Sequence, residues 1–191
     1  MHRFKSKDVA SIVVFSALWG ILNSTISPIF FRVTGLPLLC DLVGFSVLAL
    51  TVWWVRKMGA ASFVGAIATI INFVFNPGGL HFLGFTAASI VFDALTCLIG
   101  YNRIFKNANS TVAYTLVVSA ASASVAGLII GTFFMAGPAL AKWGGVLGWA
   151  GLHALGGFIG GMIGATLVIA LTTRGIHSLK GLKDGMHSAK R

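Results

Sequence analysis

Long, uninterrupted runs of apolar residues constrain the fold of this chain more than any other feature of its sequence. Six runs lie between short polar or basic connections, at about residues 9–31, 36–55, 58–75, 80–101, 111–137 and 145–173. A helix of about 20 apolar residues crosses the roughly 30 Å of hydrocarbon in a bilayer. The third run is the shortest, and we expect its helix to extend back from Ala60 through Gly59 and Met58. The runs do not alternate apolar with polar residues, as the strands of a membrane β-barrel would.

The composition agrees with a protein that folds inside a membrane. Hydrophobic residues make up 57% of the 191 residues and charged residues 9%, whereas soluble domains carry about 25% charged residues. The chain has four aspartates and no glutamate, which excludes a solvated acidic surface and most carboxylate-rich metal sites. We therefore predict an all-α membrane protein, with a single domain over residues 1–191 that forms a six-helix transmembrane bundle.

The basic residues are unevenly distributed among the tails and connections. Of the 14 lysines and arginines, only Arg32 and Lys142 fall in the first, third and fifth connections. Because cytoplasmic loops carry the excess of basic residues, we predict a multi-pass protein of the cell membrane with both termini in the cytoplasm. Bases placed in this way face anionic lipid headgroups. The net charge of +10 is therefore not taken to indicate binding to nucleic acid.

Small residues recur every four positions in three of the runs. Such stripes let two helix backbones approach closely, where van der Waals packing replaces the missing hydrophobic drive. They pack inside the bundle, or one of them docks a separate membrane subunit, and the sequence leaves both interpretations open. The stripes are Ser16, Gly20 and Ser24; Ser119, Ala123, Gly127 and Gly131; Gly156, Gly160 and Gly164; and Gly157, Gly161 and Ala165.

Two aspartates lie inside the predicted spans, where a charged side chain is costly and is by default a functional candidate. Asp41 lies close to the predicted outer end of the second span, and Asp93 lies well inside the fourth. Either could be the counter-charge to a cationic or amine-bearing solute. The alternatives are structural: Asp41 pairs with Arg32, and Asp93 is a hydrogen-bonded packing acid or lies at a subunit contact.

Other polar and aromatic residues collect with Asp41 in the predicted outer half of the bundle. Asparagine amides can hydrogen-bond the edge of a heteroaromatic ring, and tryptophan can stack on a ring or attract a cation. An apolar pocket with a few convergent polar groups is typical of small-molecule sites. Other roles stay open: Trp149 in the interfacial belt, His81 at the interface, and Asn72 bonding between helices. The candidate binding residues are Asp41, Asn23, Asn72, Asn76, His81, Asp93, Trp149 and His153.

Motifs of the common enzymes are missing from the sequence. It contains no H-E-x-x-H, G-x-S-x-G, P-loop or C-x-x-C pattern. We therefore expect no catalysis, no resident metal or cofactor, and no ATP hydrolysis by this chain. Cys40 and Cys97 are the only cysteines, and at their spacing we predict small buried hydrophobes, not a metal or redox site.

Three short stretches carry a likeness to a known family. They are Arg56-Lys57-x-Gly59-Ala60 at the start of the third span, Asn76-Pro77-Gly78-Gly79 at its end, and residues 85–95. They resemble the substrate-binding membrane subunits (S components) of energy-coupling factor transporters, in the YkoE-like branch. Asp93 stands where relatives tend to carry a glutamate. The likeness covers about residues 9–173 in size, number of spans and cytoplasmic termini.

The resemblance implies a vitamin or vitamin precursor bound in an outward-facing pocket, in this branch thiamine or its hydroxymethylpyrimidine moiety. It also implies a complex with a transmembrane coupling subunit and two cytoplasmic ATPases. S components carry a small-residue motif on the first helix against the coupling subunit. Ser16, Ala17 and Gly20 are the matching small positions here, without the usual pair of alanines four apart.

Other functions stay open beside this leading hypothesis. The chain could be an S component for another vitamin or small solute. It could instead be a self-sufficient channel or secondary carrier, which would work without ATPases. A membrane enzyme that uses Asp and His is disfavoured, because no paired acids lie at helical spacing.

Overall fold

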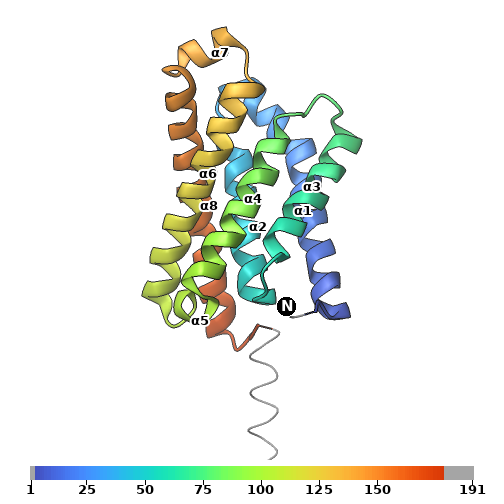
Figure 1. Ribbon diagram of the computed structural model, residues 1–191, viewed down its shortest axis with the longest axis vertical. Helices are drawn as coiled ribbons and strands as arrows, with labels where there is room; N and C mark the ends of the chain where they lie inside the picture. The colour runs from blue at the N-terminus through green and yellow to red at the C-terminus, as the bar shows by residue number, and fades with distance from the viewer. Residues whose placement is uncertain (1–2, 179–191) are drawn as a thin grey trace, which may run out of the picture.

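The computed structural model describes residues 3–178, which form helices and no strand (Figure 1). Five of these helices are long and apolar enough to cross a membrane, namely α1, α2, α4, α6 and α8. The prediction of an all-α chain with several helices able to cross a membrane is therefore confirmed for the described residues. The helices are α1 (Ser6–Thr34), α2 (Leu38–Val55), α3 (Ala60–Phe75), α4 (Phe82–Ile99), α5 (Tyr101–Ile104), α6 (Ala108–Phe133), α7 (Gly137–Lys142) and α8 (Gly145–Thr173).

The third predicted span is shorter than expected. α3 has 16 residues and begins at Ala60, so the expected extension back to Met58 is wrong. Gly59 has a φ of 94°, a left-handed conformation that a right-handed helix does not accept. The fifth span also differs, because α6 starts at Ala108, after the cap formed by Asn107, and ends at Phe133. The short helices α5 and α7 lie mainly in the connections between the predicted spans.

Six helices pack as a closed ring in the order α1, α3, α4, α6, α8 and α2, with α2 against α1 again. α2 lies toward the interior, where it also touches α3, α4 and α6. The ring is filled by large buried side chains such as Trp19, Phe45 and Phe85. Large apolar side chains are also exposed outside it, for example Val14 and Leu155. An apolar exterior of this kind suits contact with lipid acyl chains.

The glycine stripes of α8 pack inside the chain, on two different neighbours. A Cβ on Gly160 would lie 2.7 Å from the backbone oxygen of Asp41 on α2. A Cβ on Gly161 would lie 2.7 Å from Oγ of Ser119 on α6. Only glycine allows such close approach, so α8 lies between α2 and α6 with its backbone near both.

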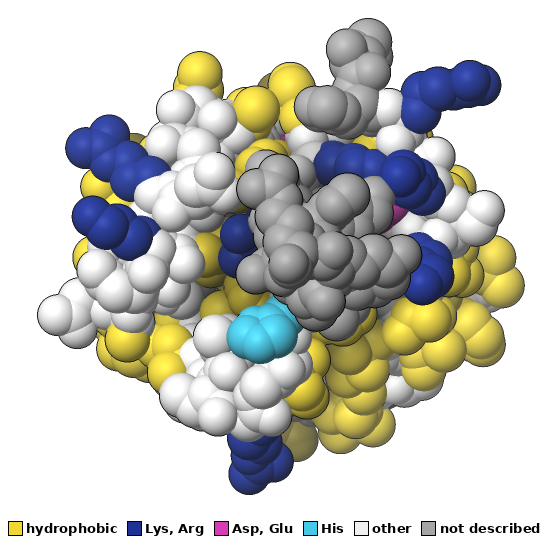
Figure 2. Space-filling model, turned by 90° about the horizontal axis from the view of Figure 1, so that it is seen from below, with side chains coloured by type: hydrophobic (Ala, Val, Ile, Leu, Met, Phe, Trp, Pro, Cys, Tyr) yellow, Lys and Arg dark blue, Asp and Glu magenta, His cyan; other side chains and the backbone are white. Residues whose placement is uncertain are grey.

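Both ends of the described chain lie at the same end of the bundle (Figure 1). The connections α2–α3 and α4–α6 also lie there, and Figure 2 shows lysine and arginine side chains spread over this surface, which we call the basic end. The opposite end carries Arg32 and Lys142, the last basic residues of α1 and α7. Four more basic residues were assigned to the cytoplasmic side by the sequence, and they lie outside the described residues: Lys180, Lys183, Lys190 and Arg191.

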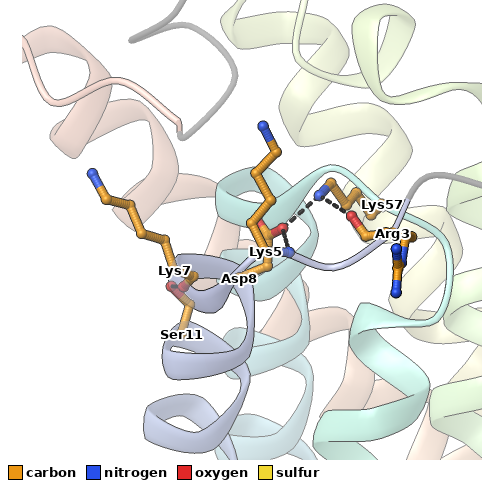
Figure 3. A network of polar contacts seen from close by, with 6 residues as sticks. All are labelled: Arg3, Lys5, Lys7, Asp8, Ser11 and Lys57. Carbon is orange, nitrogen blue, oxygen red and sulfur yellow. Dashed lines mark hydrogen bonds and ion pairs between the residues drawn. The ribbon is translucent and has the colours of Figure 1, made fainter.

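A polar network fixes the N-terminal segment to the basic end (Figure 3). Oδ2 of Asp8 accepts hydrogen bonds from the backbone N–H of Lys5 at 2.7 Å and from Nζ of Lys57 at 2.5 Å. Lys57 also donates to the backbone oxygen of Arg3 at 3.0 Å. The network thereby joins the start of α1 to the α2–α3 connection. These contacts account for the buried carboxylate of Asp8 without a ligand.

Candidate functional site

A cavity of about 170 Å³ lies at the end of the bundle opposite the basic end. The second half of α1, the beginnings of α2, α4 and α8, and the ends of α3 and α6 surround it. Its lining is largely apolar, with polar groups from several helices. The lining residues are Asn23, Ser27, Pro28, Phe31, Arg32, Pro37, Cys40, Asn72, Asn76, His81, Phe82, Phe85, Ile130, Met135, Trp149 and His153.

Four buried polar atoms of this lining have no hydrogen-bond partner among the described residues. They are Nδ2 of Asn23 and of Asn72, Nε1 of Trp149 and Nε2 of His153. Each of these side chains is at most 3% exposed. An unsatisfied buried polar group costs about 1–3 kcal/mol. Six other buried polar atoms of residues 3–178 also lack a hydrogen-bond partner, but these four belong to side chains from three helices that line one cavity, where a bound molecule would supply the missing partners.

Asp41 lies behind His153 and not on the lining of the cavity. Nδ1 of His153 is 3.0 Å from each carboxylate oxygen of Asp41, and both side chains are almost fully buried. A carboxylate at Nδ1 favours a proton on that nitrogen and leaves Nε2 toward the cavity. The arrangement depends on Gly156, where a Cβ would lie 2.7 Å from Cβ of Asp41. The alternative pair of Asp41 with Arg32 is not formed.

Aromatic rings form one side of the site around His153. The ring of His153 meets those of Phe85 and Trp149, each with centroids 5.6 Å apart. Phe31 meets Trp149 edge-on at 6.2 Å. All three contacts are edge-to-face, which is a favoured geometry for aromatic pairs. Trp149 is 2% exposed, which places it in the interior and not in an interfacial belt.

The α3–α4 loop closes over the cavity with Asn76 and His81. A Cβ on Gly79 would lie 2.6 Å from Nδ2 of Asn72 and 3.0 Å from Nδ2 of Asn76, so a side chain there would press on both amides. Burial lowers the pKa of His81, and the nearby His153 lowers it further. A neutral His81 can offer one donor and one acceptor to a bound molecule.

Six of the eight predicted binding residues line the cavity: Asn23, Asn72, Asn76, His81, Trp149 and His153. Asp41 touches it only through His153. Sequence reasoning did not select Ser27, Cys40, Arg32 or the apolar lining residues. Spacing along the helix could have identified Ser27, which lies four positions after Asn23 on the same face of α1. Its hydroxyl donates a hydrogen bond to Oδ1 of Asn23. Cys40 is half-buried at the lining, whereas a small buried hydrophobe was expected.

Asp93 lies away from this cavity, near the basic end. Its Oδ2 accepts hydrogen bonds from the backbone N–H groups of Gly59 and Ser62, at 2.7 and 3.1 Å, and from the hydroxyl of Ser62 at 2.8 Å. Asp93 therefore holds the start of α3, as the packing alternative proposed. Its selection as a residue of the same pocket as Asp41 is corrected, because the two acids lie near opposite ends of the bundle.

The small positions selected for partner docking on α1 face the inside of the bundle. Ser16 is fully buried and bonds its own helix, with Oγ 2.7 Å from the backbone oxygen of Ile12. A Cβ on Gly20 would lie 2.8 Å from the side chain of Ile71 on α3. Ala17 is half-buried. This part of the stripe packs α1 on α3, so Ser16 and Gly20 do not present a surface to another subunit.

A second cavity of about 260 Å³ opens at the basic end, beside Arg56, Lys106 and His177. None of the unpaired buried polar atoms found within residues 3–178 belongs to its lining. It also borders Ser178, the last described residue. The cavity at the opposite end is therefore the better candidate for a specific site.

The candidate site has no metal-binding group in the described part of the chain. Residues 3–178 contain no cluster of three or more His, Cys, Asp or Glu side chains that could hold an ion. In comparisons with protein families, curated proteins and solved structures, nothing matched the chain.

Proposed function

We propose that this chain is the solute-binding subunit of a membrane uptake system, and that its cavity receives the solute. One observation carries the proposal: four buried polar atoms without partners surround a single cavity between membrane-crossing helices. Buried polar groups normally have a hydrogen-bond partner, and the proposed solute would supply it.

The proposed orientation places the basic end in the cytoplasm and the cavity toward the outside of the cell membrane. The distribution of basic residues supports it, since Arg32 and Lys142 alone lie at the cavity end of the described chain. α3 would be the sixth crossing, and both termini would be cytoplasmic. The cavity would then be open to solutes that arrive from outside.

The proposed solute is a thiamine-related compound, as the resemblance to the S components of energy-coupling factor transporters implies. Hydroxymethylpyrimidine, a single ring, suits the space better than the two rings of thiamine. A cavity of about 150 Å³ binds benzene, and the cavity here is about 170 Å³. The same resemblance implies a transmembrane coupling subunit and two cytoplasmic ATPases as partners, with this chain as the binding and not the catalytic part.

Titration of the purified full chain in an uncharged detergent tests the proposed ligand. We expect hydroxymethylpyrimidine to quench tryptophan fluorescence saturably and thiamine to bind more weakly. Trp149→Phe should remove most of the quenching, whereas Trp54→Phe, which changes a tryptophan bonded to Ser11 near the basic end, should leave it. Asn72→Leu should weaken binding at least tenfold, which is about 1.4 kcal/mol. Failure of both compounds to bind would refute a thiamine-related ligand.

The partners are tested separately, by purifying the tagged chain from the membranes of its own cells. Co-purified ATPase subunits are expected. Uptake by liposomes that contain only this chain would refute the need for them.

The buried pair of Asp41 and His153 favours a second candidate, a proton-coupled secondary carrier. The pair can hold a proton between α2 and α8, and His153 also lines the cavity. Such a carrier would move solute into liposomes driven by a pH gradient alone. Absence of that uptake, together with ATP-dependent transport in the assembled complex, would exclude it.

A further inference from the structure

The charged side chain in the lining of the cavity and the nearest charged side chain of α7 are both basic. Arg32 is the one charged side chain in the lining, and it is exposed at the end of α1. It takes part in none of the hydrogen bonds and ion pairs found within residues 3–178. Lys142 lies nearby, with Nζ 3.7 Å from the position that a Cβ on Gly35 would take. Arg32 and Lys142 therefore bring two positive charges to this end, against the single carboxylate of Asp41 among the described residues.

No free carboxylate offsets these cations. Asp41 is 0% exposed and is already bonded to His153. Asp8 and Asp93 hold the starts of α1 and α3 near the basic end. Among the described acids, none is left to face a cationic ligand in the cavity.

The unpaired polar atoms of the lining are mainly donors. The indole Nε1–H of Trp149 can only donate, and the amide nitrogens of Asn23 and Asn72 donate as well. Nε2 of His153 donates or accepts according to its protonation. A ligand that satisfies them must bring hydrogen-bond acceptors on its edge.

We propose that the cavity selects a single-ring molecule that bears acceptors and no positive charge, and that Arg32 sets this charge preference. This rests on the proposed function and names the ligand class of the same site. It also separates the two thiamine-related compounds. Uncharged hydroxymethylpyrimidine is admitted, whereas thiamine, with its permanently cationic thiazolium ring, is rejected by charge as well as by size.

Three ligands of nearly one shape test the charge preference without depending on any vitamin. Benzoate, benzamide and benzamidinium share one phenyl ring, and their substituents carry charges of −1, 0 and +1. Calorimetric titration of the full chain in an uncharged detergent should show benzamidinium binding at least tenfold more weakly than benzamide. Benzoate should bind at least as tightly as benzamide.

The variant Arg32→Gln should reduce the ratio of benzoate to benzamidinium affinity at least tenfold and leave benzamide within about twofold. Arg103→Gln makes the same change of net charge near the basic end and should leave the ratio unchanged. If both variants change the ratio of affinities equally, the preference comes from the net charge of the whole protein, which would refute the role of Arg32. Benzamidinium binding as tightly as benzamide, or no binding of any of the three at millimolar concentration, would overturn the proposal.

These outcomes are distinct from failure of the proposed function. If hydroxymethylpyrimidine binds and benzamidinium is preferred over benzoate, the uptake function stands and the charge rule is wrong. If hydroxymethylpyrimidine does not bind and the order of the three probes holds, the ligand class stands and the thiamine-related identity is wrong.

Discussion

Asp93 supplies what the first residues of α3 lack, an acceptor for their backbone donors. The N-cap residue of α3 is Gly59, which has no side chain to accept a hydrogen bond. Oδ2 of Asp93 reaches across from α4 and accepts from Gly59 and Ser62 instead. A side chain from another helix thus takes the role that a serine or aspartate usually fills in sequence. The hydrogen bonds from these three donors offset the cost of burying the carboxylate of Asp93.

We expect Asp93→Ala to lower the free energy of unfolding by about 2 kcal/mol or more, since three donors lose their acceptor. Ser62→Ala removes one of those hydrogen bonds and should cost less. Thermal unfolding in detergent, followed by circular dichroism, measures both. Asp93→Asn should leave the affinity for hydroxymethylpyrimidine unchanged. A tenfold loss of affinity would instead assign Asp93 to the binding site.

The sequence predicts which polar residues share an end of the bundle, but not which way each one points. Depth along a span follows from counting residues, which places Asn72 and His153 in the outer half. Direction depends on the rotation of a helix, and a span that is apolar on all sides does not reveal it. Depth therefore separates Asp41, near the outer end of its span, from Asp93, well inside the fourth, but it does not show which groups either carboxylate contacts. Arg32 was interpreted as a marker of orientation and as a partner of Asp41, because nothing in sequence shows that the end of α1 borders a cavity.

α8 owes its position to glycines on two of its faces. On the face toward α2, a Cβ on Gly160 would meet the backbone oxygens of Asp41 and Leu42 at 2.7 and 3.0 Å. Backbone atoms cannot rotate aside, so α2 would have to move. Gly151, on the same helix, has nothing within 4 Å of such a Cβ. The two glycines therefore allow the same substitution to be compared in a packed and in an open place.

We expect Gly160→Ala to lower the free energy of unfolding by about 1–3 kcal/mol, the usual cost of overpacking. Gly151→Ala should stabilise the chain by up to about 1 kcal/mol, because alanine favours the helix. Both are measured by thermal unfolding in detergent. Equal effects of the two substitutions would contradict the close contact of α8 with α2.

Helix positions are predicted well where apolar runs end in charge or glycine, and less well where a local conformation decides. α8 covers the predicted residues 145–173. The start of α3 is set by the left-handed Gly59, and α7 begins at Gly137 with Pro138 in its first turn. These are backbone effects of one or two residues, too small to change the hydropathy of a run. Small-residue spacing does predict close helix packing, but it does not say whether the neighbour is in the same chain.

The number of crossings depends on α3. With 16 residues and a rise of about 1.5 Å per residue, α3 is about 24 Å long, shorter than the roughly 30 Å of a hydrocarbon core. Short helices cross by local thinning of the bilayer or with help from flanking residues. α3 also packs on α1 and α4, which are long enough to cross. Residues 3 and 178 lie at the same end of the bundle, which requires an even number of crossings between them. The five longer helices give an odd number, and α3 as a sixth crossing makes it even.

Single cysteines in a chain without Cys40 and Cys97 test this arrangement with a membrane-impermeant maleimide. We expect Gly78→Cys and Lys142→Cys to react in intact cells, because both lie at the cavity end. Met58→Cys and Lys106→Cys should react only after permeabilisation, since the proposed orientation places the basic end in the cytoplasm. The pair at positions 58 and 78 flanks α3, so labelling of both from one side would show that α3 does not cross. Reversal of all four would place the cavity toward the cytoplasm and refute its role in uptake from outside. The parent chain without cysteines, which should not react, is the control.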